Sequence, residues 1–183
     1  MPTDLKIGII GGSGMEDPAF ISDYSSKAVS TPYGNTSSEL VMGNIADVPV
    51  KILSRHGPGH KINPTNVNYR ANIWSLKEEG CTHILAVTAC GSLRERIEPG
   101  HFVFPHQFID RTTKRVNTYF DGSDVQHVSM SEPFSTKLRN CLVQACVDLE
   151  FAHHDGGTVV TIEGPRFSTK AESMMFRSWG CDV

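Results

Sequence analysis

Three places in the sequence carry the kinds of side chain that bind an oxyanion. Arg55 is followed by His56, Thr88 is followed by Ala89, and Ser13 lies within a run of glycines. A guanidinium presents a planar fork that matches the oxygens of a phosphate, histidine titrates near neutral pH, and hydroxyl groups donate hydrogen bonds. Small neighbouring residues allow backbone N–H groups to approach the same ligand. Together these residue types indicate an anion-binding site.

Each of the three segments also has an ordinary structural explanation. Arg55 and His56 suit a surface pair at a strand end, residues 88–92 suit a close-packed turn, and residues 11–14 suit a turn that needs the conformational freedom of glycine. All three segments follow apolar runs of strand type, however. If these strands are neighbours in one sheet, the donors converge on one point, and such a convergence is much less expected by chance than any single segment.

The glycine-rich segment differs from the common nucleotide-binding loops. Gly12 and Gly14 follow a strand-like run as in a dinucleotide fingerprint, but Asp17 takes the place of the third glycine and Pro18 disfavours a tight helix start. No Gly-Lys-Ser/Thr sequence of the P-loop type is present. What remains is a loop whose N–H groups and serine hydroxyl can donate to an anion.

Histidines and cysteines carry no metal signature. Six histidines lack metal-ligand spacing with acidic partners, and we interpret them as structural or surface residues: His60, His83, His101, His106, His153 and His154. The five cysteines are odd in number and include no C-x-x-C pair, so neither a disulfide framework nor a structural zinc site is predicted. We expect no metal and a reducing compartment, the cytoplasm, with the nucleus as an additional location.

Length and charge narrow the choice of partners. The 183 residues suit one domain over residues 1–183. The net charge of -3 and the absence of a Lys/Arg-rich block argue against nucleic acid as a partner. No apolar segment reaches the length of a membrane span, so we also expect no membrane partner. Small-molecule ligands are therefore favoured.

Strand and helix patterns alternate around the donor segments. Strands are predicted at residues 6–10, 38–45, 48–54, 83–87, 102–109 and 158–162. Helices are predicted at residues 66–79, from Leu138 to Leu149, and from the capping box Thr169–Glu172 to Gly180. Residues 111–131 lack periodicity and suit a functional or interface loop. The alternation predicts an α/β fold with a mixed, largely parallel central sheet flanked by helices, and a ligand site at the carboxyl ends of the strands.

Six segments taken in order carry a family resemblance: KIGIIGGSG, SRHGPGH, NYRANIWSLKEEGCTHILAVTACGSL, QFIDRT, SEPF and TIEGPRFSTKAES. Across residues 6–183 the chain resembles the purine nucleoside phosphorylase superfamily, and within it the 5'-methylthioadenosine phosphorylases. The order RHG, TACGSL, EGPRF is specific, whereas GGSG alone is not. The resemblance implies a nucleoside phosphorylase fold and phosphorolysis of 5'-methylthioadenosine to adenine and 5-methylthioribose 1-phosphate, in purine and methionine salvage. Inorganic phosphate would be a co-substrate, and no cofactor is implied.

The resemblance also implies residue roles. The phosphate-binding residues would be Ser13, Arg55, His56, Thr88 and the backbone N–H of Ala89. Phe167 would pack against the purine or sugar, Ser168 would occupy the position linked to base specificity, and His127 would reach the 5' substituent bound by a neighbouring subunit of a homotrimer. Many family members have threonine in place of Ser13, which keeps the hydroxyl donor. Phe167 also suits a core position after Pro165, and His127 also suits an ordinary loop position.

The group that protonates the purine is not found among these motifs. In the family, a Thr-Asp-Tyr-Asp-like segment supplies that aspartate and a Met-Thr pair meets the ribose and phosphate, and both would lie beyond Val183. Glu163 is expected instead to form hydrogen bonds around its own turn. We therefore expect the chain to be incomplete at its C-terminus and inactive alone. Two alternatives stay open: a phosphorylase for 6-oxopurine nucleosides such as inosine or guanosine, and a non-catalytic truncated isoform.

Overall fold

The computed structural model describes residues 5–12 and 19–183. The chain divides into two compact units, one formed by residues 1–89 with 115–119 and the other by residues 90–114 with 120–183.

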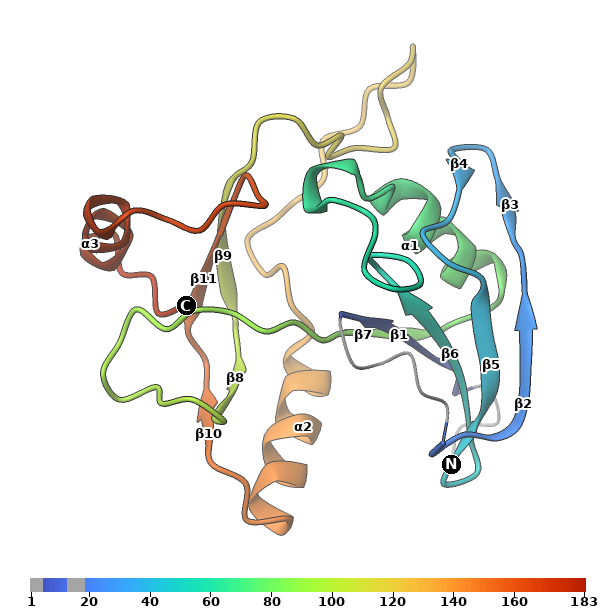
Figure 1. The fold of residues 1–183 in the computed structure, drawn as a ribbon, viewed down its shortest axis with the longest axis horizontal. Coiled ribbons are helices and arrows are strands. Elements are labelled where there is room, and N and C mark those ends of the chain that lie inside the picture. The colour runs from blue at the N-terminus through green and yellow to red at the C-terminus, as the bar shows by residue number, and fades with distance from the viewer. Residues whose placement is uncertain (1–4, 13–18) are drawn as a thin grey trace. The chain divides into compact units, whose positions relative to one another are not determined.

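The first unit is built on a five-stranded sheet in the order β2-β5-β6-β1-β7 (Figure 1). Its strands are β1 (Ile7–Gly11), β2 (Ser22–Lys27), β5 (Leu40–Ile45), β6 (Val48–Ser54) and β7 (His83–Ala86). The central strand β1 runs parallel to β6 and β7, whereas β5 runs antiparallel to β6 and β2. A short ladder of β3 (Ser30–Thr31) and β4 (Gly34–Asn35) lies between β2 and β5 in the sequence. The predicted α/β fold with a mixed central sheet is confirmed.

Strand β2 was not predicted from the sequence. Its six residues, SDYSSK, show no alternation of apolar and polar side chains, and all six are exposed. The strand lies at the edge of the sheet and is held by backbone pairing to β5. Such a strand owes its extended shape to its neighbour and not to burial, so a hydrophobic pattern cannot reveal it.

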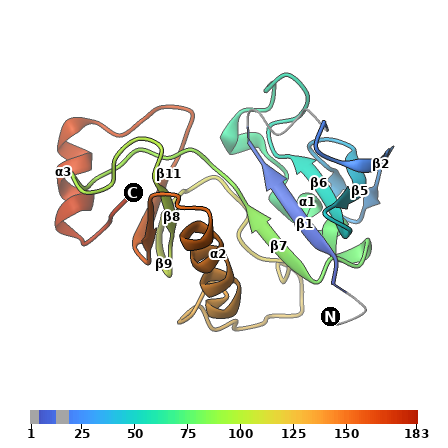
Figure 2. The same ribbon diagram turned by 90° about the horizontal axis from the view of Figure 1, so that it is seen from below.

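Helix α1 (Tyr69–Glu78) covers one face of this sheet (Figure 2). Its Leu76 packs with Leu40 and Leu53, and all three side chains are 0% exposed. Gly8 on β1 permits the close approach of the helix, because a Cβ atom there would lie 3.1 Å from Cδ1 of Leu76. The core of the first unit therefore lies between this helix and the sheet.

The ends of α1 follow from local hydrogen bonds. The predicted start at residue 66 is wrong by three residues, because Pro64–Asn66 form a separate 3-10 turn. Asn68 then caps α1 by accepting a hydrogen bond from the N–H of Ala71 at 3.2 Å. At the other end Gly80 has a φ of +80°, as expected of a glycine that stops a helix.

The second unit contains two parallel strand pairs. Strand β8 (Phe102–Phe104) pairs with β10 (His153–Asp155), and β9 (Gln107–Arg111) pairs with β11 (Thr158–Ile162). The single strand predicted over residues 102–109 is wrong, because Pro105 has no N–H to continue a ladder. The facing strand breaks at the same level, where Gly157 has a φ of +132° and its carbonyl accepts the N–H of His106 at 3.1 Å. The short polar strand β10 was not predicted.

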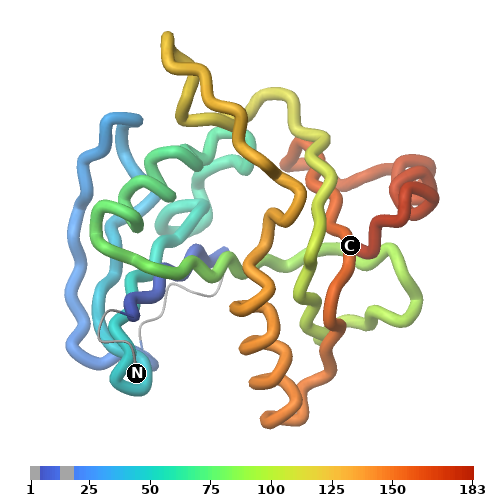
Figure 3. Tube along the Cα trace, turned by 180° about the vertical axis from the view of Figure 1, so that it is seen from behind, coloured from blue at the N-terminus to red at the C-terminus, as the bar shows by residue number. Residues whose placement is uncertain are grey.

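Two helices complete the second unit, α2 (Thr136–Asp148) and α3 (Lys170–Ser178). Both were predicted, and the capping box at the start of α3 is present: Thr169 accepts the N–H of Glu172 at 3.1 Å, and the Glu172 carboxylate accepts the N–H of Thr169 at 2.7 Å. Between β9 and α2, residues 112–135 form a long segment without helix or strand (Figure 3). The predicted loop is confirmed.

Candidate anion-binding site

The pairing of β6, β1 and β7 places three loops at one edge of the sheet. Because the three strands are parallel and adjacent, their carboxyl ends at Ser54, Gly11 and Ala86 lie side by side. The N–H of Arg55 donates to the carbonyl of Gly11 at 3.0 Å, which ties the loop after β6 to the end of β1. The carboxyl edge therefore brings together the starts of the segments that the sequence marks as anion donors, as far as residues 11–12, 55–56 and 88–89 describe them.

The guanidinium of Arg55 spans two of these loops. Its Nη1 donates to the carbonyl of Val87 at 3.0 Å and its Nη2 donates to the hydroxyl of Thr88 at 3.1 Å. Its Nε donates to the ring nitrogen Nε2 of His56 at 3.1 Å. Burial lowers the pKa of Arg55, yet the partners that the described residues supply are all neutral. A half-buried cation of this kind is suited to an anionic ligand.

Gly12 has a role at this site that the sequence pattern alone does not indicate. A Cβ atom at residue 12 would lie 2.8 Å from Nη2 of Arg55. The absence of a side chain therefore lets the guanidinium lie against the backbone at the end of β1. The sequence signal was a glycine directly after a strand, but its partner Arg55 lies 43 positions later by the sequence numbering and becomes visible only in the fold.

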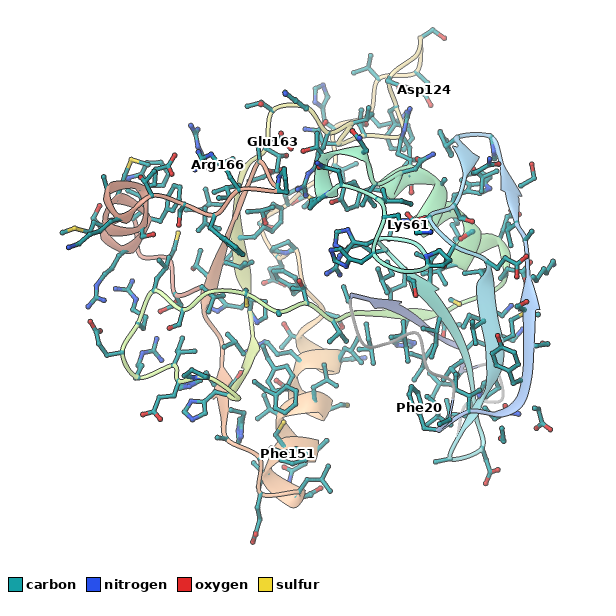
Figure 4. All side chains as sticks on the ribbon, in the orientation of Figure 1. Phe20, Lys61, Asp124, Phe151, Glu163 and Arg166 are labelled. Atoms are coloured by element: carbon teal, nitrogen blue, oxygen red, sulfur yellow. The ribbon has the colours of Figure 1, made fainter. Side chains whose placement is uncertain are left out.

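His56 lies below the surface beside Arg55, with 9% of its area exposed. Its Nδ1 lies 2.9 Å from the carbonyl oxygen of Ile62, and its ring centroid lies 4.2 Å from that of His60. Burial makes the largest contribution to lowering the pKa of His56; the bond to Ile62 raises it, and the charge of Arg55 lowers it further. The imidazole is thus held neutral in the loop after β6, in which Lys61 is labelled in Figure 4.

The remaining predicted anion donors differ in how far the structure describes them. Thr88 and Ala89 are exposed, and the Thr88 hydroxyl also donates to the carbonyl of Ala89 at 3.2 Å. Ser13 lies outside the described residues. The structure therefore brings Arg55, His56 and Thr88 together, with Ala89 next in the chain.

The predicted nucleoside-binding residues belong to the second unit. Phe167 is 91% exposed in the turn before α3, which excludes the alternative that it is a core residue of that unit. The hydroxyl of Ser168 lies 2.7 Å from that of Ser173. His127 is exposed in the loop between β9 and α2. Their role in binding a nucleoside stays a prediction.

Glu163 lies at the end of β11 (Figure 4) and connects two distant segments. Its Oε2 accepts the N–H of Thr113 at 2.8 Å and the N–H of Lys114 at 2.9 Å. These two hydrogen bonds are directed to the loop after β9, whereas the expected bonds were around its own turn. Through these two bonds, Glu163 holds the first residues of the segment 112–135 beside the end of β11.

Other kinds of site find little support in the described part of the chain. Within residues 5–12 and 19–183, no group of three or more His, Cys, Asp or Glu side chains could hold a metal ion. No helix among the same residues combines the length and apolar character of a membrane span. All five cysteines are free thiols.

The parallel sheet edge brings the Arg55 guanidinium and the Thr88 hydroxyl together, and both are groups that bind phosphate. The chain belongs to the phosphorylase superfamily, which matches residues 6–183. It is similar to S-methyl-5'-thioadenosine phosphorylase of Danio rerio, with 56% identity over 98% of this chain and 66% of the relative. The protein of the same name from Drosophila pseudoobscura pseudoobscura is 54% identical over 100% of this chain and 65% of the relative. The chain thus spans just under two thirds of the length of these relatives.

Solved structures of nucleoside phosphorylases also match the fold of this chain. Methylthioadenosine phosphorylase from Schistosoma mansoni in complex with adenine matches with a TM-score of 0.91 and 44% identity, over 97% of this chain and 72% of that chain. The same protein in its apo form matches with a TM-score of 0.92 and 44% identity, over 97% of this chain and 71% of that chain. The expected nucleoside phosphorylase fold is confirmed.

Proposed function

We propose that the protein containing this chain uses inorganic phosphate to split 5'-methylthioadenosine into adenine and 5-methylthioribose 1-phosphate. The observation that carries the phosphate half of this proposal is the Arg55 guanidinium, held at the carboxyl edge of the sheet with neutral partners and next to the exposed Thr88. The nucleoside half rests on the relatives, which are named for methylthioadenosine, and on the adenine complex of the Schistosoma mansoni enzyme.

The reaction requires an anion next to the sugar carbon whose bond to the purine is broken. The bond from that carbon to the purine nitrogen breaks, a bond to a phosphate oxygen forms, and positive charge develops on the sugar in between. The phosphate is then both the nucleophile and the opposing charge. Ser13, Arg55, His56, Thr88 and the N–H of Ala89 would form the phosphate site, and donors fixed in advance contribute most when charge develops in the transition state.

The nucleoside side of the proposal uses residues of the second unit. Phe167 would pack against the purine or sugar, Ser168 would lie near the base, and His127 would reach the 5' substituent in a neighbouring subunit. The proposal therefore includes a homotrimer. Light scattering on the purified protein tests that assembly, and a monomer at all concentrations would remove His127 from the site.

Steady-state phosphorolysis tests the activity itself. The purified full-length protein that contains this chain is given phosphate with methylthioadenosine, and in parallel phosphate with inosine. We expect phosphate-dependent release of adenine and little turnover of inosine. Preferential turnover of inosine would instead favour the 6-oxopurine alternative, and no turnover of either nucleoside would count against the proposed function.

The proposal places the reaction in purine and methionine salvage in the cytoplasm, with the nucleus as a second location. The products support this placement, because adenine and a methylthio sugar phosphate can re-enter purine and methionine synthesis. Imaging of the tagged protein in its own cells tests the location, and signal confined to a secretory compartment would contradict it.

A further inference from the structure

Both ring nitrogens of His56 are already occupied by groups of the protein. A carbonyl oxygen can only accept a hydrogen bond, so the 2.9 Å contact between Nδ1 and the carbonyl of Ile62 requires a proton on Nδ1. In a neutral ring Nε2 then carries a lone pair. That lone pair accepts the hydrogen of Arg55 Nε at 3.1 Å. One tautomer therefore satisfies both contacts, and the ring has no further N–H to offer a ligand.

The surroundings disfavour a second proton on this ring. Protonated Nε2 would point an N–H at the Nε–H of Arg55, and both hydrogens would face one another at a contact of 3.1 Å. The titratable and charged groups that act on the imidazole are Arg55 of the same loop, His60, whose ring is tilted against it, and Arg115. Burial and these neighbours lower the pKa of His56, and only the bond to Ile62 raises it.

The loop that carries His56 is closed by a reciprocal pair of bonds. The N–H of Ile62 donates to the carbonyl of His56 at 2.9 Å, and the imidazole returns a bond to the carbonyl of Ile62. The turn also depends on Gly57, whose φ is +71° and whose Cβ position would lie 3.0 Å from the carbonyl oxygen of Ser37. The ring is thus fixed from the backbone side and presents Nε2 in a defined direction.

The consequence for Arg55 is a guanidinium held at three points. Nε is bound by His56, Nη1 by Val87 and Nη2 by Thr88. A long flexible side chain that is ordered before its ligand arrives loses less entropy on binding. The single N–H of Arg55 Nε is thereby used by His56, and each terminal nitrogen keeps a second N–H with which to bind a ligand.

We propose that His56 is a positioning residue: its neutral ring orients the Arg55 guanidinium for an anion and does not itself donate to that anion. This revises the ring contact to phosphate that the family resemblance implied for His56. The inference rests on the proposed function only for the identity of the anion as phosphate.

A double-mutant cycle tests whether His56 acts through Arg55. Phosphate affinity is measured for wild type, His56→Ala, Arg55→Lys and the double variant, as the KM for phosphate and by calorimetry with sulfate. We expect His56→Ala to weaken anion binding about tenfold in the wild-type background, the size of one charge-assisted contact, with the KM for the nucleoside unchanged. In the Arg55→Lys background, we expect His56→Ala to cause almost no further loss of anion affinity, because lysine has no Nε–H for the His56 ring to bind. Equal losses in both backgrounds would overturn the proposal.

Conservative variants separate the two contacts of the ring. His56→Gln can place an amide oxygen near the position of Nε2, whereas His56→Asn can keep only a donor near Nδ1. We expect Gln to restore much of the anion affinity lost in His56→Ala, and Asn to restore little. His60→Gln, which changes the neighbouring ring, serves as the matched control. Rescue by Asn but not by Gln would contradict the assignment.

The pH dependence of sulfate binding provides a readout that a merely structural role would not change. Sulfate keeps its charge where histidine titrates, near pH 6.5. We expect wild-type affinity to be flat from about pH 8 to about pH 6.5 and to weaken below it as His56 gains a proton. Affinity that instead strengthens with acid in wild type, but not in His56→Gln, would show a direct imidazolium contact.

Nitrogen-15 spectra of the histidine rings test the geometry without any activity. We expect His56 in the free protein to be protonated at Nδ1 and not at Nε2, and the opposite tautomer would refute the inference. Failure of both phosphate and sulfate to bind would count against the proposed function instead. The two failures are therefore distinguishable.

Discussion

Arg55 concentrates the chemistry of the candidate site in one side chain. Its fork reaches Val87, Thr88 and His56, and it stands at the end of the strand next to β1. Arg55→Ala should raise the KM for phosphate by roughly ten- to a hundredfold, since a charge-assisted contact contributes about 1.5–3 kcal/mol. Phosphate-dependent initial rates measure the effect. Lys61→Ala changes an exposed cation of the same loop and should leave the KM near the wild-type value; equal effects of both substitutions would indicate a general charge effect.

Gly12 tests the same site from the backbone side. In Gly12→Ala the new Cβ would lie 2.8 Å from Nη2 of Arg55, so the guanidinium must move. Because a flexible side chain can yield, we expect the KM for phosphate to rise with little change in melting temperature. Gly122→Ala is the control, since a Cβ at residue 122 meets nothing within 4 Å. A large fall in melting temperature with unchanged phosphate KM would mean that Gly12 serves the fold instead.

At the scale of elements, the C-terminal end of α1 is joined to two strands through Glu79. Its carboxylate accepts hydrogen bonds from Lys27 of β2 at 2.6 Å and from Lys51 of β6 at 2.8 Å, and Lys51 also donates to the Glu79 carbonyl. The two lysine ammonium groups also lie near the negative end of the helix dipole, where positive charge is stabilising. The hydrogen bonds from Lys27 and then Lys51 lower the pKa of Glu79, against burial, which raises it. The contact therefore stabilises the ionised form.

This shift predicts a pH dependence of stability. A carboxyl whose pKa is lower in the folded than in the unfolded protein adds stability above its unfolded pKa, about 4.3, and loses it as pH falls through the folded pKa. Glu79→Gln should therefore lower the free energy of unfolding near neutral pH and differ progressively less from wild type below about pH 4. Urea unfolding across this range measures the difference. Glu78→Gln, one exposed position earlier, should change little; a difference for Glu79→Gln that is constant with pH would exclude the ion-pair explanation.

At the scale of the whole molecule, the cluster of fully buried leucines lies in the first unit. Leu53 contacts Leu40 and Leu76 there, all at 0% exposure, whereas Leu149 at the end of α2 is 63% exposed. Leu53→Ala should cost about 2–5 kcal/mol of unfolding free energy, because it leaves a cavity. Leu149→Ala should cost much less. Chemical denaturation of both variants checks this, and similar losses would mean that Leu149 is covered in the assembled protein.

Local patterns predicted most elements because the forces that shape them are local. The strands beside the donor segments are apolar runs, α3 begins at its capping box, and α1 and α3 end before Gly80 and Gly180, whose φ values are +80° and +88°. Strand β2 and the break at Pro105 were missed. Strand β2 forms because it pairs with β5 across the sheet. The break at Pro105 is matched by Gly157 on the facing strand, whose carbonyl accepts the N–H of His106. Neither feature can be recognised in a short window of sequence.

The sequence by itself determined the family, the α/β class, the three helices with the apolar strands, and the kinds of donor at the strand ends. Only the tertiary structure decided which donors meet and how. Arg55 finds Val87 and Thr88 at separations of 32 and 33 residues, through a β6-β1-β7 order that no local pattern specifies. The same structure placed Gly12 under the guanidinium and gave His56 its tautomer. Those features depend on distances of about 3 Å between atoms from different loops, and such distances are set by packing and pairing of the whole sheet.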